Sequence, residues 1–250
     1  MIALDVNVCY DIPLIKKGMV KMKQLRSKRQ MSETLFVGSV LSIIGGYFDT
    51  YTYMTRGGVF ANAQTGNIVL LGLSLADGNI TKALLYLIPI FAFILGVIVA
   101  EFIHRVCNTK HLHWRQIIIL VELLVIILVS LIPSSNTSSY AYDMAANVLI
   151  SFVCSLQVQS FRKIHGIVCA TTMCTGNLRS ASEALVRYGR THDKTALKAA
   201  LKFTVINLFF IVGIVISLFI TRIFNEKSII FCGFGLLLVL ALMFIKPMEE

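Results

Sequence analysis

An acidic residue lies within the first strongly apolar stretch of the sequence. Asp49 falls within residues 34–54, where a carboxylate is costly to place in a bilayer and is expected to face protein or water. Small residues precede it on the same helical face, at Gly38, Ser42, Gly45 and Gly46. We expect this face to be packed, with Asp49 carrying a proton, binding a cation or pairing with Arg56 one to two turns away.

The tripeptide Thr-Gly-Asn occurs twice, as Thr65, Gly66 and Asn67 and again as Thr175, Gly176 and Asn177. Its residue types suit a break in a membrane helix, with threonine as the N-cap, glycine for close backbone approach and asparagine as donor and acceptor. Broken backbone at membrane depth survives only where protein or water covers it. Each tripeptide therefore predicts a short helix whose positive N-terminus faces a polar or anionic solute. The alternative is that the tripeptide only lets two helices pack closely.

A second acidic residue, Glu122, is flanked by Leu, Val and Ile in a later apolar stretch. The same reasoning predicts a substrate-binding role, and the alternative is a protonated or hydrogen-bonded packing residue. Glu101 lies near the end of its stretch beside His104 and Arg105, where an interfacial salt bridge is expected. Four further polar residues lie within apolar stretches and either face a cavity or bond between helices: Asn147, Gln157, Gln159 and Asn207.

No motif for catalysis or metal binding is present. The sequence has no H-E-x-x-H, G-x-S-x-G or Walker A pattern, so we expect neither an enzyme nor a cofactor. Its six cysteines form no C-x-x-C pair and are expected to be reduced packing residues that bind no metal. The net charge of +10 does not predict nucleic-acid binding, because its largest block precedes a membrane helix, where anionic lipid is the nearer partner.

The composition is that of a multi-pass helical membrane protein. Of 250 residues, 56% are apolar and 14% are charged. A helix needs about 20 apolar residues to cross a bilayer core of roughly 30 Å. Six stretches meet this need, near residues 34–54, 83–106, 116–132, 144–161, 203–221 and 229–245. The first has no small-residue cleavage site, so we expect it to stay as a helix and not to be removed as a signal peptide.

The two tripeptides stand in similar surroundings. Residues 60–70 read FANAQTGNIVL and residues 170–180 read ATTMCTGNLRS, with an offset of 110 residues. Each copy follows one expected membrane helix and precedes two more, and Gly96 and Ala100 match Gly213 and Ser217. We therefore expect a basic cytoplasmic tail over residues 1–33 and two repeats in one membrane domain, over residues 34–135 and 136–250.

The distribution of Lys and Arg predicts the orientation, because cytoplasmic loops carry the excess. With the N-terminus inside and both tripeptides dipping into the membrane without crossing it, nineteen of the 23 basic residues lie inside. If both tripeptides cross, fourteen lie inside and eight outside, with Arg179 left in the membrane. The re-entrant arrangement is favoured, with both termini cytoplasmic. Each repeat then crosses three times, so the second is inverted relative to the first.

Three segments carry a family resemblance: GGYFDTYTY (45–53), GGVFANAQTGNIVLLG (57–72) and TTMCTGNL (171–178). They resemble the YoaK-type family of bacterial multi-pass membrane proteins, over roughly residues 34–245. The resemblance implies a location in the bacterial cytoplasmic membrane and marks Asp49 and the tripeptides as motif residues. It implies no particular substrate.

Together these patterns predict an all-α integral membrane protein with six transmembrane helices and two short re-entrant helices in a three-plus-three inverted repeat. We expect a secondary transporter or facilitator of a small polar or anionic solute, with its site between the tripeptides and Asp49 as the coupling group. The alternative is a non-transporting scaffold, lipid-binding or regulatory protein, whose polar residues only hold the helices together. Six helices form a small body that can pair as a homodimer.

Overall fold

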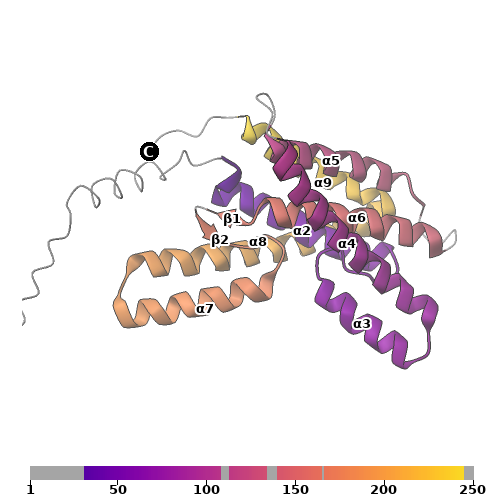
Figure 1. Ribbon diagram of the computed structural model, residues 1–250, viewed down its shortest axis with the longest axis horizontal. Coiled ribbons are helices and arrows are strands. Elements are labelled where there is room, and N and C mark those ends of the chain that lie inside the picture. The colour runs from indigo at the N-terminus through magenta and orange to yellow at the C-terminus, as the bar shows by residue number, and fades with distance from the viewer. Residues whose placement is uncertain (1–30, 108–112, 134–139, 165, 245–250) are drawn as a thin grey trace, which may run out of the picture.

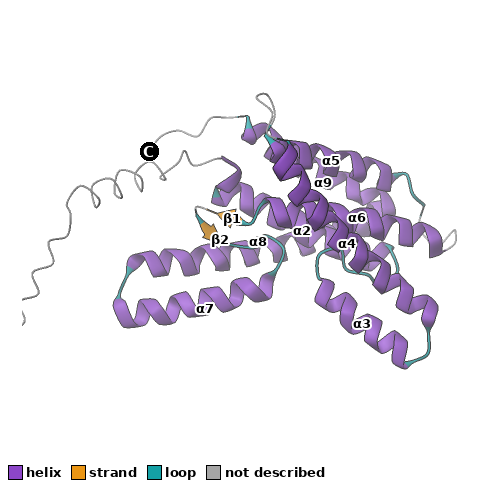
Figure 2. Cartoon of the chain, in the orientation of Figure 1, coloured by secondary structure: helices purple, strands orange, loops and turns teal. Residues whose placement is uncertain are grey.

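The computed structural model describes residues 31–107, 113–133, 140–164 and 166–244, which are almost entirely helical (Figures 1 and 2). Most of the basic tail, and with it the predicted contact with anionic lipid, lies outside the described residues. In chain order the elements are η1 (Met31–Glu33), α2 (Leu35–Thr55), α3 (Gln64–Ala76), α4 (Ile80–Val106), α5 (Trp114–Ser130), α6 (Tyr140–Ser160), β1 (Lys163–Ile164), β2 (Ile167–Val168), α7 (Cys174–Thr191), α8 (Lys194–Phe224), η2 (Asn225–Ile229) and α9 (Ile230–Met243).

Each stretch that the sequence predicts to span the membrane contains a helix. Within the described residues, three helical runs are long and apolar enough to cross a bilayer: α4, α6 and the continuous run Lys194–Met243, which contains α8, η2 and α9. The apolar helix α3 is shorter. α8 begins before the apolar stretch 203–221 that it contains, and Asp193 caps it by accepting a hydrogen bond from the backbone N–H of Thr195 (2.8 Å).

The long helices pack in two pairs. α2 lies along α8, and α4 lies along α6. α5 packs on α6 and α9, while α9 also packs on α2. The main hydrophobic core lies between α2, α5, α6 and α9 and includes Leu41, Phe48, Ile119, Ile150 and Leu236. This arrangement buries one stripe of each helix and leaves the outer faces apolar, as expected for contact with lipid.

Glycines set the closest approach within both pairs. Gly213 of α8 faces the backbone of Ile43 in α2, and a Cβ atom there would overlap that backbone. Gly96 of α4 faces the carbonyl oxygen of Phe152 and the side chain of Ser155 in α6. Small residues let two membrane helices approach closely, so both pairs depend on a glycine at the crossing.

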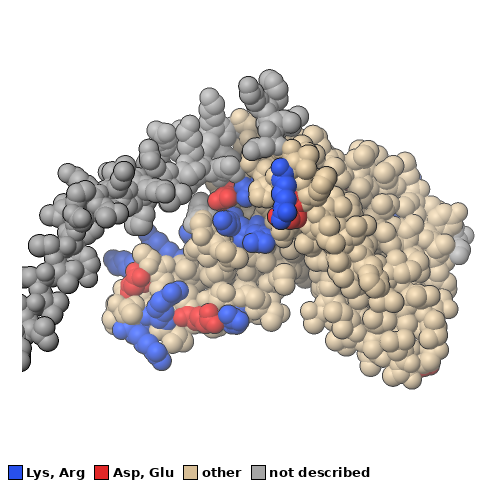
Figure 3. All heavy atoms as spheres, in the orientation of Figure 1, with Lys and Arg blue, Asp and Glu red and all other residues tan. Residues whose placement is uncertain are grey.

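Two helical hairpins extend from these pairs (Figure 1). α3 lies against α4, and α7 lies against α8. The contact between α7 and α8 is lined by small buried side chains: Ala181, Ala184, Ala196 and Ala200. α3 carries no charged residue, whereas basic side chains gather over the α7–α8 hairpin in Figure 3. The exposed ones are Arg179, Arg187, Arg190, Lys194 and Lys198.

Candidate functional site

An irregular loop precedes each short helix. The first loop joins the end of α2 at Thr55 to the start of α3, and the second joins β2 to α7. Gly57 and Gly58 turn the chain in the first loop, with φ angles of +79° and +74°, and Gly166 turns it between β1 and β2 with a φ of +77°. Glycine adopts these left-handed conformations without strain. Both tripeptides therefore follow a chain reversal.

The short helices begin before the threonines. Their N-cap residues are Ala63 and Met173, and neither makes a side-chain capping bond. Thr65 and Thr175 are the second residue of each helix and are exposed. The prediction that the threonines act as N-caps was wrong. Another residue of the tripeptide, in the first turn of each helix, forms hydrogen bonds to the preceding loop. The start of the helix is therefore fixed without a capping side chain.

That residue is the asparagine, which ties each loop to its own helix. Asn67 donates from Nδ2 to the carbonyl oxygen of Phe60 (2.7 Å) and accepts the Phe60 N–H at Oδ1 (2.9 Å). Asn177 likewise donates from Nδ2 to the carbonyl oxygen of Ala170 (2.6 Å). In both copies the partner lies seven residues before the asparagine, and both asparagines are buried. The two tripeptides thus fold their chains alike, and their amides serve the loop.

The glycines of the two tripeptides have different surroundings. A Cβ atom at Gly66 would come within 2.9 Å of the Phe60 ring, so the first copy needs a residue without a side chain. A Cβ atom at Gly176 would meet no atom within 4 Å. Close packing therefore explains the glycine in the first tripeptide and leaves the second unexplained.

Asp49 lies where the first loop meets α2. Its Oδ1 atom accepts the backbone N–H groups of Asn62 (2.6 Å) and Ala63 (3.4 Å). The side chain of Asn62 in turn donates to the carbonyl oxygen of Gly45 (3.1 Å). Backbone N–H groups just before a helix stabilise a carboxylate, so Asp49 holds the residues that lead into α3.

The second loop reaches the same place on α2. A Cβ atom at Gly45 would come within 2.5 Å of the Cγ2 atom of Thr172, which lies in the loop before α7. Asn62 and Thr172 occupy equivalent positions, three residues before the threonine of each tripeptide. Gly45 therefore lies between the two loops, in contact with the same position of each. We call this place the loop junction and define it by Gly45, Asp49, Asn62 and Thr172.

Buried polar atoms at the loop junction lack hydrogen-bond partners among the described residues. They are Oδ1 of Asn62 and the hydroxyl oxygen of Thr172, together with that of the neighbouring Thr171. An unpaired buried polar group costs about 1–3 kcal/mol, so these atoms favour a polar ligand or bound water. None of the three was predicted as a site residue, although all lie in the segments that carry the family resemblance. The offset of 110 residues, which relates Asn62 to Thr172, was the signal that could have found this pair.

Arg56 does not pair with Asp49, as one of the sequence-based alternatives proposed. Its Nη1 atom lies 3.5 Å from Oδ1 of Asp143 in α6, and both side chains have an exposed fraction of 0%. The guanidinium also donates to the carbonyl oxygens of Ile132 and Pro133, each at 2.8 Å. That alternative was wrong, because Arg56 instead joins the end of α2 to the end of α5 and the start of α6.

Glu122 lies away from the two loops, on α5. The helix packs on α6 and α9, and the side chain has an exposed fraction of 0%. Neither carboxyl oxygen has a hydrogen-bond partner among the described residues. Glu122 is thus a deeply buried acid, and Cys154 of α6 lies between it and the loop junction, because the thiol interacts with Glu122, Asp49 and the side chain of Asn62.

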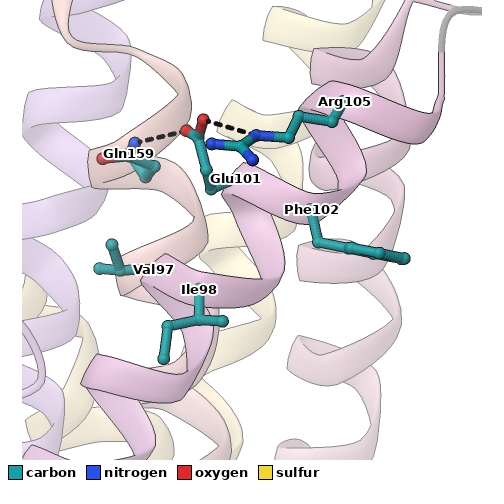
Figure 4. A pocket seen from close by; sticks show the side chains of 6 residues that line it. All are labelled: Val97, Ile98, Glu101, Phe102, Arg105 and Gln159. Atoms are coloured by element: carbon teal, nitrogen blue, oxygen red, sulfur yellow. Dashed lines mark hydrogen bonds and ion pairs between the residues drawn. The ribbon is translucent and has the colours of Figure 1, made fainter.

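A hollow on the surface of α4 and α6 contains none of the predicted site residues (Figure 4). Its volume is about 490 Å³, and it is lined by Val97, Ile98, Glu101, Phe102, Arg105 and Gln159. Glu101 accepts hydrogen bonds from Arg105 (3.3 Å) and Gln159 (3.1 Å). The salt bridge predicted at Glu101 is confirmed, and it is solvent-accessible.

Comparison with known proteins places the chain in a family. Residues 37–243 match the family described as "Protein of unknown function (DUF1275)". The chain belongs to this family. It is also 27% identical over 147 residues to the UPF0700 transmembrane protein YoaK of Bacillus subtilis (strain 168). That match covers 59% of this chain and 56% of YoaK, so it spans little more than half the length of the relative. No solved structure matches.

The DUF1275 match includes Asp49 and both tripeptides, and it confirms the family resemblance seen in their motifs. A relative that is a transmembrane protein also supports a membrane location. Since the match runs from Val37 to Met243, nearly all the described helices belong to the family region.

Within each tripeptide we predict that two alanine substitutions differ in their effect on stability. Asn67→Ala and Asn177→Ala should each lower the free energy of unfolding by about 1–3 kcal/mol, because they leave backbone groups of the loop without a partner. The matched controls Thr65→Ala and Thr175→Ala should change it by less than about 0.5 kcal/mol, because both threonines are exposed and cap nothing. Thermal unfolding in detergent measures all four. Equal losses from threonine and asparagine variants would contradict this account.

Proposed function

We propose that this DUF1275 protein is a secondary transporter or facilitator that moves a small polar or anionic solute across the cytoplasmic membrane. The observation that carries the proposal is the loop junction, where two equivalent loops meet on α2 beside buried polar atoms that lack hydrogen-bond partners within the described part of the chain. In transporters, substrate sites lie between structural repeats, at helices broken in the membrane. The site is therefore assigned to the loop junction, with Thr171 beside it.

We further propose six crossings and an inverted repeat. The packing supports this arrangement, because three contacts of the first half have counterparts in the second. The packing of α2 on α8 corresponds to the packing of α6 on α4. The packing of α3 on α4 corresponds to that of α7 on α8, and the packing of α5 on α6 corresponds to that of α9 on α2. The glycines at the crossings, Gly213 and Gly96, correspond as well. Contacts that correspond in this way are expected when two repeats form one body around a pseudo-twofold axis.

The charge of the two hairpins supports the orientation. The α7–α8 hairpin carries five exposed basic side chains, whereas the turn of the α3–α4 hairpin has only Lys82 beside it, so the α7–α8 hairpin is assigned to the cytoplasmic side. α3 would then end at the opposite face. The two loops approach the centre from opposite sides in this arrangement, which is what alternating access requires of a shared site.

The free atoms at the loop junction favour a neutral polar solute over an anion. Asn62 offers a carbonyl oxygen, and Thr171 and Thr172 offer hydroxyl groups that both donate and accept. Asp49 already accepts the N–H groups of the first loop, so these donors are not free to bind an anion. Asp49 therefore acts as the residue that fixes the first loop beside the solute.

A thermal-shift screen of the purified protein tests the proposal. The probes are single amino acids, sugars, polyols, amides, nucleobases and short organic acids, each added to the protein in detergent. A bound solute should raise the unfolding temperature, and Asn62→Ala and Thr172→Val should abolish that rise. The control Thr65→Ala should retain it. If no probe raises the unfolding temperature, or if a rise survives both junction variants, the scaffold alternative is favoured.

A further inference from the structure

Glu122 combines complete burial with a carboxyl group that nothing compensates. Its side chain has an exposed fraction of 0%, and both oxygen atoms lack partners among the described residues. An ionised carboxylate without a partner is very costly in an apolar interior, so such a group takes up a proton. Glu122 is therefore a neutral carboxylic acid in this conformation.

Asp49 has the opposite surroundings, although it is also buried. Its carboxyl group accepts the backbone N–H groups of Asn62 and Ala63, whereas the carboxyl group of Glu122 accepts none among the described residues. Asp49 and Glu122 thus differ in the hydrogen bonds that their carboxyl groups receive.

Among the residues that the structure describes, no basic side chain pairs with Glu122. The titratable groups that interact with its carboxyl are two thiols, Cys154 of α6 and Cys232 of α9. Two other elements also contact α5. η2 carries Glu226 and Lys227, next to the Tyr51 end of α2, and α4 carries His104, which stacks on Trp114 at the start of α5. None of the ion pairs among the described residues includes Glu122.

A line of buried polar side chains leads away from Glu122 along α6. Asn147, Ser151 and Cys154 are spaced by four and three residues, so they share one face of the helix. All three are fully buried, and Oδ1 of Asn147 and the hydroxyl of Ser151 lack partners among the described residues. Asn147 donates to the carbonyl oxygen of Arg56 (2.7 Å). The line therefore connects the neighbour of Glu122 to the buried pair of Arg56 and Asp143.

We propose that Glu122 carries the proton that this protein couples to solute movement, and that the polar line of α6 is the path of that proton. In the conformation described, the carboxyl O–H bond is intact. When the pair of Arg56 and Asp143 separates and water enters along α6, that bond breaks and the proton passes to water. The carboxylate left behind is hydrated until it takes a proton back and the path closes. The coupling rests on the proposed function, whereas the protonation of Glu122 stands independently.

Infrared spectroscopy of the protein in lipid nanodiscs tests the protonation. At neutral pH the wild-type protein should show the carbonyl stretching band of a neutral carboxylic acid. Glu122→Gln should lose a component of that band, and Asp49→Asn should keep that component, so a band that Glu122→Gln leaves unchanged overturns the proposal. The band should also disappear at strongly alkaline pH, and more slowly in the variant Ser151→Val. A band that persists there in the wild type identifies a fixed packing group and overturns proton carriage.

A second readout separates this proposal from the proposed function. Proteoliposomes containing a pH-sensitive dye are exposed to the solute found in the thermal-shift screen. The wild-type protein should move protons with that solute, and Glu122→Gln should lose proton movement while still binding the solute. Solute movement without proton movement in the wild type overturns the role of Glu122 and leaves the transport function intact. If no solute binds at all, the transport function fails while the infrared result still decides the protonation of Glu122.

Discussion

Arg56→Met is expected to lower the free energy of unfolding by about 3–5 kcal/mol, because it leaves the Asp143 carboxylate buried without its cation. The same substitution removes the donors to the carbonyl oxygens of Ile132 and Pro133, at the end of α5. Three elements, α2, α5 and α6, are joined through this one guanidinium. Unfolding by heat or denaturant in detergent measures the loss.

A double-mutant cycle separates this pair from its surroundings. The variant Arg56→Met with Asp143→Leu should be less destabilised than the sum of the two single variants, because neither charge is left alone. The control is Arg105→Met, which removes an exposed partner of Glu101 and should cost less than about 1 kcal/mol. Additive losses from Arg56 and Asp143 would mean that the two side chains do not act as a pair.

Substitutions of glycine by alanine are expected to have opposite signs at different places in the bundle. Gly96→Ala and Gly213→Ala should each destabilise the protein by about 1–3 kcal/mol, because the added methyl group must push apart helices whose backbones are in contact. Gly72→Ala in α3 should stabilise it by up to about 1 kcal/mol, because alanine favours a helix and the methyl group meets no atom within 4 Å.

The three glycine variants are compared in one thermal-unfolding series. The added methyl group is the same in each variant, so the sign of the change in unfolding temperature reports the space available at each glycine. A stabilising shift at Gly96 or Gly213 would show that the paired helices do not approach as closely as the structure places them. A destabilising shift at Gly72 would show that α3 packs against something other than α4.

The sequence predicted the helices and the likeness of the two tripeptides, because both leave a local signal. Apolar stretches of spanning length mark α4 and α6 directly, and the repeated letters predicted that the two loops fold alike. The equal bonds of Asn67 and Asn177, each to a residue seven positions earlier, agree with that prediction. The helix starts were misplaced because threonine is only a statistical sign of an N-cap, and here an asparagine within the helix holds the loop.

The partners of the buried charges could not be predicted. Asp49 is held by backbone N–H groups, which every residue except proline has and which no residue type therefore reveals. The partner of Arg56 lies 87 residues away in α6, whereas the acid nearest to it on its own helix is Asp49. Arg56 pairs with Asp143 and not with Asp49 because α6 packs beside the end of α2, and the sequence does not reveal that packing.

Peptide tags placed after Gly78 and after Arg190 test the central claim most directly, because these positions follow α3 and end α7. If the two loops enter from opposite faces and meet at Gly45, an antibody should reach the first tag on intact cells and the second only after permeabilisation. Tags that are both reached on intact cells, or both only after permeabilisation, would contradict the inverted repeat and remove the shared site.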